Sequence, residues 1–507
     1  MYNKNEQIKI MPHFGGGLDN NDIASEINDW ELADITNFEV DDKVIMTAAG
    51  IVDYGSDDVG GPIYGAFQGQ FEDGSDIRLR QNGSVLQYDI GNAIWKDTDL
   101  TLLAQTRASF AMLNNTILIS NGVDPVYSST DGMTWTEQAT LPRSKKIVHN
   151  KLNRIIFAAQ PDTPSKINWS EINDPLTVDA AAYQFIGKND GEHIQDVVVT
   201  EQGGVYIFKT KNVYVMGDVT FNMVGVDPIG SFPYVPFTAV VTENSVMATG
   251  VDGIYEIGGA TINHISKNLN KASTNLMTMN TPVATYFNNK YRVSLPINSM
   301  HNDVEYVLNR KQQTGNPFSP YVITKNNREI GCYMLEEAVV SNVARYRVYI
   351  GGSVDGSFGW INEYHDQGEP QGVFRGPQTC TFTTKFFTEN AEFFIKRYLR
   401  FFISVVSLSD TIATIEYRYD IAGNWLEKLL QINTAEFGWE YDDGTTGDFD
   451  EGYSFMTLDS VEDFISLEKY NTNEVNRGVQ FRFTVETTKD LKILSTAFKF
   501  ITKPNFH

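Results

Sequence analysis

Residues 77–88 read Ile-Arg-Leu-Arg-Gln-Asn-Gly-Ser-Val-Leu-Gln-Tyr. Apolar and polar residues alternate on both sides of the Asn82-Gly83 pair, as in a strand with one buried face. An Asn-Gly pair favours the tight turns that join antiparallel strands, because both residues tolerate a positive φ angle. This stretch therefore predicts a β-hairpin.

Similar units recur up to about residue 365, each with a short apolar strand, a turn rich in Gly, Asn, Asp or Pro, and a second strand. The units begin at residues 77, 116, 155, 205, 246, 291 and 346, so their spacings are 39, 39, 50, 41, 45 and 55. A four-stranded propeller blade repeats every roughly 40–50 residues, and several blades must pack around an axis to bury their apolar faces. We predict an all-β chain with a β-propeller of about six blades, or seven. The alternative is a series of unrelated hairpins in stacked sandwiches.

The hairpin rhythm stops at Gln367-Gly-Glu-Pro-Gln-Gly372, a turn-rich stretch that predicts a domain boundary near residue 370. Beyond it, long alternating strands predict a β-sandwich, and they include residues 401–406, 411–419 and 479–485. We expect an extended leader over 1–55, the propeller over 56–370 and the sandwich over 371–507, with leader and sandwich together forming a platform. One or two short helices are predicted over 261–280.

The composition suits this fold and bounds the function. Aromatic residues make up 12% of the 507 residues and Gly occurs 40 times, a mixture typical of strands and tight turns. The formal charge of −24 argues against a protein that grips nucleic acid, although an acidic surface suits a conduit that DNA passes without adhering. Two cysteines cannot staple a chain of this size, and no apolar run reaches membrane-spanning length, so we expect a soluble, unexported chain without a membrane segment.

No motif predicts an enzyme. The seven His are scattered without metal-ligand spacing, and neither a nucleophile elbow nor a phosphate-binding Gly-rich loop is present. The acidic loop over 442–451 offers oxygen ligands for calcium but departs from the EF-hand spacing, which favours a solvated turn. We predict no catalytic, cofactor-binding or metal-binding residues and no enzymatic activity.

Two further stretches have a functional and a structural interpretation. Residues 129–135 resemble the Asp-box of sialidase-type propellers, one residue short, a hairpin turn in which the Asp accepts backbone amides and the Trp packs beneath. Basic clusters occur at 143–146 and at Lys396, Arg397 and Arg400, and the second lies beside aromatic residues that could stack on nucleic acid. Strand alternation instead favours an apolar core face with the charges in solvent.

The beginning of the chain resembles a leader of phage structural proteins. It contains Gly15-Gly-Gly-Leu-Asp19, then Glu31-Leu-Ala-Asp-Ile-Thr-Asn-Phe38, then Gly50-Ile51. Residues 47–49 replace the basic residue that usually precedes this last Gly.

The order of later pieces resembles the nozzle, or tail-hub, proteins of short-tailed bacteriophages, also called head-stabilising proteins. The matching pieces are two paired-strand blades, a short Ile-Ser-Lys helix, the opening of the C-terminal part and its last strands, over 197–216, 251–258, 265–269, 382–391, 477–483 and 493–500.

This resemblance implies a homohexameric ring beneath the portal and its head-to-tail adaptor, in the tail of a virion assembled in the host cytoplasm. The platforms would enclose the DNA-ejection channel, with tail fibres or spikes and a tail plug or needle as further partners. A closed ring needs two distinct patches that meet at every interface, and we expect the leader and the strands after residue 380 to supply them. Two alternatives stay open: a carbohydrate-binding or depolymerase propeller of the receptor-binding apparatus, and a tail or baseplate component of a long-tailed phage.

Overall fold

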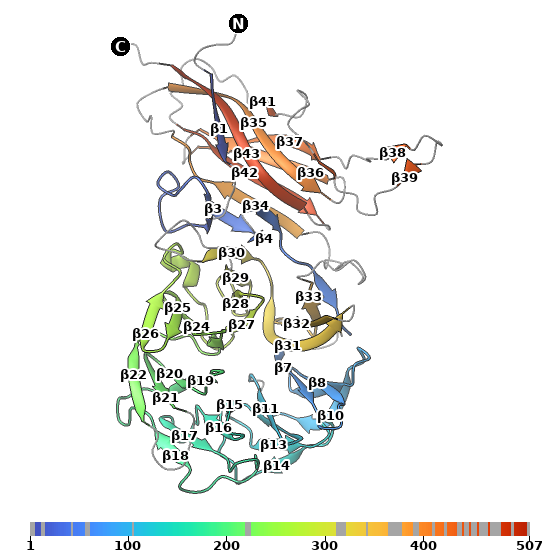
Figure 1. Ribbon diagram of the computed structural model, residues 1–507, viewed down its shortest axis with the longest axis vertical. Helices are drawn as coiled ribbons and strands as arrows, with labels where there is room; N and C mark the ends of the chain where they lie inside the picture. The colour runs from blue at the N-terminus through green and yellow to red at the C-terminus, as the bar shows by residue number, and fades with distance from the viewer. Residues whose placement is uncertain are drawn as a thin grey trace.

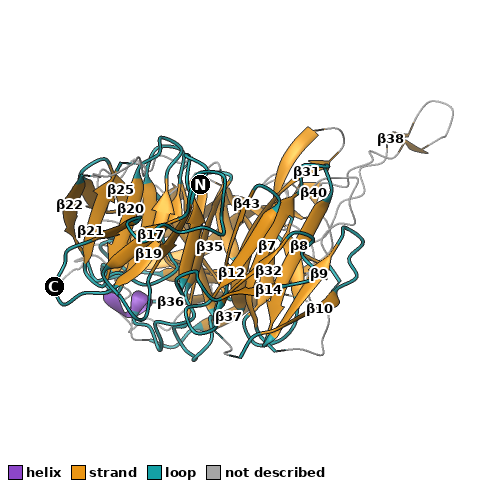
Figure 2. Cartoon of the chain, turned by 90° about the horizontal axis from the view of Figure 1, so that it is seen from below, coloured by secondary structure: helices purple, strands orange, loops and turns teal. Residues whose placement is uncertain are grey.

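The computed structural model describes most of the chain. It covers residues 6–11, 16–41, 44–55, 61–103, 106–217, 225–310, 321–340, 343–362, 378–388, 395–407, 411–419, 423–432, 439–440, 446–447, 454–455, 465–466, 478–487 and 491–503. The predicted boundary near residue 370 and most of the acidic loop over 442–451 lie outside the described residues. Figure 2 shows that strands run through the whole molecule.

Six separate four-stranded sheets form most of a propeller. The first four sheets are each a meander of consecutive strands. They are β7 (Ile63–Gln70), β8 (Asp76–Asn82), β9 (Val85–Asp89) and β10 (Lys96–Thr101); β11 (Ser109–Leu113), β12 (Thr116–Ser120), β13 (Val126–Ser129) and β14 (Thr136–Gln138); β15 (Lys146–His149), β16 (Ile155–Ala158), β17 (Lys166–Trp169) and β18 (Tyr183–Phe185); and β19 (Ile194–Val199), β20 (Val205–Lys209), β21 (Asn212–Met216) and β22 (Val226–Ser231).

The remaining blades differ in how they are completed. The fifth sheet contains β23 (Val240–Val241), β24 (Val246–Gly250), β25 (Gly253–Gly258) and β26 (Thr261–His264). A seventh four-stranded meander, β27 (Val283–Phe287), β28 (Lys290–Leu295), β29 (Val304–Asn309) and β30 (Val322–Asn326), belongs to a larger sheet. The last blade contains β31 (Ile330–Val340), β32 (Val343–Gly352) and β33 (Phe358–Ile361), and its outer strand is β6 (Ile51–Asp53) from the leader.

The first strands of the seven units close a ring around the axis. Contacts run in the order β7, β11, β15, β19, β23, β27, β31 and back to β7. The seven hairpin units of the sequence thus correspond to seven meanders, so the ring has seven blades, the upper of the six or seven that the sequence predicts. Figure 1 shows this ring below the platform.

The predicted helices over 261–280 are wrong for most of that stretch. Residues 261–264 form the outer strand β26, because they complete the meander of the fifth blade by pairing with β25. The only helical turn there is the 3-10 helix η1 (Lys271–Thr274).

The platform is a β-sandwich. One layer contains β1 (Glu6–Met11), β4 (Phe38–Asp41), β5 (Val44–Thr47), β35 (Ile395–Ser407), β40 (Ser454–Phe455), β41 (Ile465–Ser466) and β43 (Leu491–Lys503). The other contains β2 (Gly17–Leu18), β3 (Glu31–Thr36), β34 (Gln378–Thr384), β36 (Thr411–Arg418), β37 (Leu426–Ile432) and β42 (Gln480–Thr487). The short pair β38 (Trp439–Glu440) and β39 (Thr446–Gly447) stands apart. Phe38, Phe382 and Phe483 meet in the core, with ring centroids 5.4–6.3 Å apart.

One sheet joins the propeller to the platform. Its ten strands run in the order β27-β28-β29-β30-β2-β3-β34-β42-β36-β37, so the sixth blade continues into the sandwich. The connection is β2, which pairs in parallel with both β30 and β3. Gly17 in β2 has a φ of 68°, and a Cβ atom there would lie 2.7 Å from the carbonyl oxygen of Ile323. Only glycine fits this position without strain.

We therefore predict that Gly17→Ala weakens the junction between propeller and platform. The added methyl group meets backbone that cannot move freely, and its residue must hold a left-handed φ, so the variant should lose about 2 kcal/mol or more of unfolding free energy. Urea denaturation followed by tryptophan fluorescence measures this. Gly258→Ala is the control, because nothing lies within 4 Å of that position. Equal midpoints for the two variants would show that the connection tolerates a side chain.

Candidate functional site

Four buried charged residues and the partly buried Lys290 gather where the leader strand β4 crosses the sixth blade. This junction cluster consists of Glu39, Lys290, Arg292, Glu305 and Arg328. Arg292 lies 3.1 Å from Glu39 and 3.3 Å from Glu305, and Arg328 lies 3.1 Å from Glu305. Lys290 lies 2.8 Å from Glu39. The charges are therefore paired across the propeller–platform boundary.

Neutral donors complete the bonding of both carboxylates. Asn326 donates to Glu305 at 2.9 Å and to Glu39 at 3.3 Å, and the hydroxyl of Tyr333 donates to Glu305 at 3.0 Å. Burial acts to raise the pKa of Glu39, but the charges of Arg292 and Lys290 outweigh it and hold that pKa well below its usual range. Burial also acts to raise the pKa of Glu305, but the charges of Arg292 and Arg328 outweigh it and lower that pKa.

A second charged group fastens the first blade to the last. Arg78 in β8 pairs with Glu336 in β31, and it also donates to Asp89 at 3.3 Å and to the hydroxyl of Tyr54 at 3.0 Å. Beside it, the guanidinium group of Arg80 lies 4.4 Å from the ring centre of Trp95. These contacts lie where the ring of blades closes.

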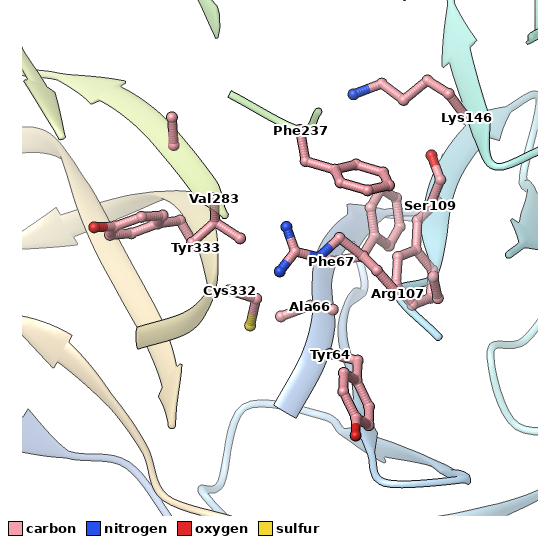
Figure 3. A pocket seen from close by; sticks show the side chains of 14 residues that line it. Tyr64, Ala66, Phe67, Arg107, Ser109, Lys146, Phe237, Val283, Cys332 and Tyr333 are labelled. Atoms are coloured by element: carbon pink, nitrogen blue, oxygen red, sulfur yellow. The ribbon is translucent and has the colours of Figure 1, made fainter. Parts of the chain in front are cut away.

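The propeller axis contains a small cavity of about 210 Å³. Its lining comes from β7, β11, β15, β27, β31 and the approach to β23, and it includes Tyr64, Arg107, Ser109, Lys146, Phe237 and Cys332. In Figure 3 the guanidinium group of Arg107 lies between Phe237 and Cys332. A wider hollow of about 720 Å³ shares Lys146 with this cavity and lies between β7, β11 and β15.

Arg107 spans the axis. It precedes β11 in the second blade, yet it donates to the carbonyl oxygens of Thr281 at 2.9 Å, Pro282 at 2.6 Å and Gly331 at 2.8 Å. These carbonyls lie just before β27 and at the start of β31. Burial lowers the pKa of Arg107 to about 10, because desolvation disfavours its charged form.

Lys146 enters the cavity from the third blade. Its amine lies 3.0 Å from Asp196, a fully buried carboxylate that also accepts a hydrogen bond from Tyr234 at 2.8 Å. Burial and the charge of Asp196 raise the pKa of Tyr234 well above its usual value.

The segment that resembles an Asp-box, residues 129–135, forms a hydrogen-bonded turn. The amides of Met133 and Thr134 each donate to Asp131 at 2.8 Å, and the hydroxyl of Ser129 donates to it at 2.9 Å. Trp135 is buried among side chains of the first two blades. The turn therefore has the geometry that the motif predicts, between β13 and β14.

The other stretches singled out in the sequence do not converge on one site. Arg143 pairs with Asp162 at the surface, whereas Lys146 points into the propeller axis. Lys396, Arg397 and Arg400 lie in β35, but the structure does not describe their side chains. Within the part of the chain that the structure describes, no three His, Cys, Asp or Glu side chains gather as metal ligands. The expected absence of a cofactor site, a metal site and enzymatic activity stays a prediction.

Sequence reasoning missed the junction cluster and the axial cations. Members of the junction cluster are up to 289 positions apart, between Glu39 and Arg328, and no local motif links them. The only available signal was the presence of charged residues within strongly apolar strands, such as Arg292 in Lys-Tyr-Arg-Val-Ser-Leu.

Comparisons with known proteins do not identify a family. No protein-family model matches the chain, and no curated protein matches its sequence. Among solved structures, a streptogramin B lyase is similar at 12% identity with a TM-score of 0.43, over 62% of this chain and 97% of that one. The extracellular domain of a one-component system from B. thetaiotaomicron is similar at 9% identity with a TM-score of 0.42, over 89% of this chain and 63% of that one. A gluconolactonase from Xanthomonas campestris is similar at 9% identity with a TM-score of 0.33, over 52% of this chain and 96% of that one.

These similarities support no statement about activity. The fold assignment follows from the radial sheets themselves. Among the described residues, no helix has the length and apolar character needed to cross a bilayer.

We predict that Arg292→Met strongly destabilises the chain. Removing this guanidinium leaves Glu39 and Glu305 buried with too little positive charge, which should lower the unfolding free energy by about 3–5 kcal/mol. Lys325→Met is the matched control, because Lys325 and Asp34 form a more exposed bridge that should contribute about 0–1 kcal/mol. Chemical denaturation at neutral pH compares the two variants, and similar midpoints would mean that the junction cluster adds little.

The depressed pKa of Glu39 also predicts a pH dependence. A carboxyl whose pKa is lower in the folded chain than its ordinary 4.5 contributes stability above that value, and this stability is lost as the pH falls toward its folded pKa. Glu39→Gln should therefore show a smaller loss of unfolding free energy between pH 5 and pH 3 than the wild type. Urea titrations at several pH values test this, and parallel profiles would contradict it.

Proposed function

We propose that this chain is a structural subunit of a bacteriophage tail, a nozzle or hub protein that forms a homohexameric ring around the DNA-ejection channel. Its role is mechanical rather than enzymatic. The ring lies below the portal and the head-to-tail adaptor in the virion, and carries tail fibres or spikes and a plug or needle. This proposal extends the resemblance found in the sequence.

The observation that carries the proposal is the ten-stranded sheet that joins the sixth blade to the sandwich. The resemblance implies a propeller attached to a platform built from both ends of the chain. The leader strands β2 to β5 and the strands after residue 378 form such a sandwich together. A sheet that runs through both parts, held by the junction cluster, suits a subunit that bears load.

Exposed apolar side chains on the platform support its role as the ring interface. Ile8 and Ile10 in the leader strand β1 are 60% and 63% exposed, and Ile412 and Leu429 in β36 and β37 are 60% and 67% exposed. Strand β37 ends the ten-stranded sheet as described. One patch from the leader and another from the C-terminal strands provide the two distinct surfaces that a closed ring needs.

The charge of the chain fits the passage of DNA. With 64 acidic and 40 basic residues, the chain should repel phosphate weakly over most of its surface. We propose that genomic DNA passes through the ring transiently and without specific binding.

Interface variants test the proposal during particle assembly. Particles are produced in cells where a phage lacking this gene is complemented by plasmid copies. The double variant Ile412→Asp with Leu429→Asp places charge on the proposed interface and should lower the yield of infectious particles at least tenfold. Both side chains are largely exposed, so thermal unfolding of the purified variant should stay close to wild type.

Leu103→Asp provides the control. Leu103 is also highly exposed, but it lies on the propeller between β10 and β11. This variant should assemble normally. If the control and the platform variant reduce particle yield equally, or if the platform variant assembles like wild type, the platform is not the ring interface.

A further inference from the structure

Two basic side chains line the same small cavity on the propeller axis. Arg107 comes from the second blade and Lys146 from the third, and both border the space of about 210 Å³. These two cations lie together in a chain whose formal charge is −24. A cleft lined by one sign of charge focuses its field on the enclosed space.

The charge of Arg107 is incompletely compensated. Its guanidinium group donates to three backbone carbonyls, and its buried Nε atom has no hydrogen-bond partner among the residues that the structure describes. The carboxylate that acts on it electrostatically is Asp196, whose two oxygens already accept from Lys146 and Tyr234. Burying a cation without a close carboxylate is unfavourable unless another negative group is supplied.

The balance of charge around the cavity favours an anion. Among the described residues, the carboxylate that offsets these two cations is Asp196, which leaves one positive charge. Cys332 adds no negative charge near neutral pH, because burial raises the pKa of its thiol to about 12. Tyr333 is also neutral, because burial and the charge of Glu305 raise its pKa well above the usual value.

Phe237 covers this charge in a strained conformation. Its ring centre lies 5.0 Å from the guanidinium carbon of Arg107, and its φ angle is 62°. Bulky residues rarely adopt a positive φ, and such strain is concentrated at ligand clamps and active sites. The surrounding structure therefore holds the Phe237 ring over the Arg107 guanidinium group at the cost of backbone strain.

We propose that the axial cavity binds a compact anion, a carboxylate or phosphate group, between Arg107 and Lys146 with Phe237 as its cover. The volume lies below the roughly 300–1,000 Å³ of pockets for drug-sized ligands, so the ligand is small. This site is independent of the ring proposed above, because it lies within one propeller and uses no residue of the platform.

Isothermal titration calorimetry on the purified full chain tests the site with sodium phosphate and sodium acetate at constant ionic strength. One equivalent of at least one anion should bind. Tighter binding of phosphate or of acetate identifies the preferred group. Lys146→Gln should weaken binding at least tenfold, and Asp196→Asn should strengthen it by a similar factor, because it removes the negative charge that neutralises the Lys146 amine.

A gain in affinity for Asp196→Asn cannot result from partial unfolding, since an unfolded variant does not bind more tightly. Asparagine can still accept the bond from Tyr234. Lys211→Gln, which changes an exposed lysine away from the cavity lining, should bind like wild type. The proposal is overturned if neither anion binds saturably, or if the Lys146 and Asp196 variants match the Lys211 control.

Discussion

The pairing of β30 with β2 is the constraint on which the rest of the structure depends. It makes the sixth blade part of the platform sheet, so the propeller cannot turn against the sandwich without breaking strand hydrogen bonds. The approach is close enough to require glycine at position 17. Beside it, the junction cluster pairs leader Glu39 with blade residues, so separating the two parts would leave buried charges unpaired.

Ring closure reinforces the same arrangement. The outer strand of the last blade, β6, comes from the leader, so the segment that builds the platform also completes the propeller. Arg78 and Glu336 then join the first blade to the last. Shared strands therefore link the platform directly to the propeller, which suits the proposed mechanical role.

Local sequence predicted the blades but not what joins them. Hairpins such as 77–88 carry their own signal, because alternation and Asn-Gly turns act within a dozen residues. The Asp-box turn was predicted for the same reason, since its hydrogen bonds span only a few positions. Strand β26 was misread as helical because Ile262 and Ile265 also fit a helical period, and pairing with β25 decided the outcome. Arg292, Arg107 and Lys146 acquire their partners only when distant blades meet, so no local spacing reveals them.

The assembly itself is the most direct test of the central claim that this chain encircles the DNA path. Cryo-electron microscopy of the virion that carries the gene should show six copies on the tail axis, with the sandwiches facing the channel and the propellers outside. Density for this chain away from that axis, or a ring in which the propellers line the channel, would contradict the account.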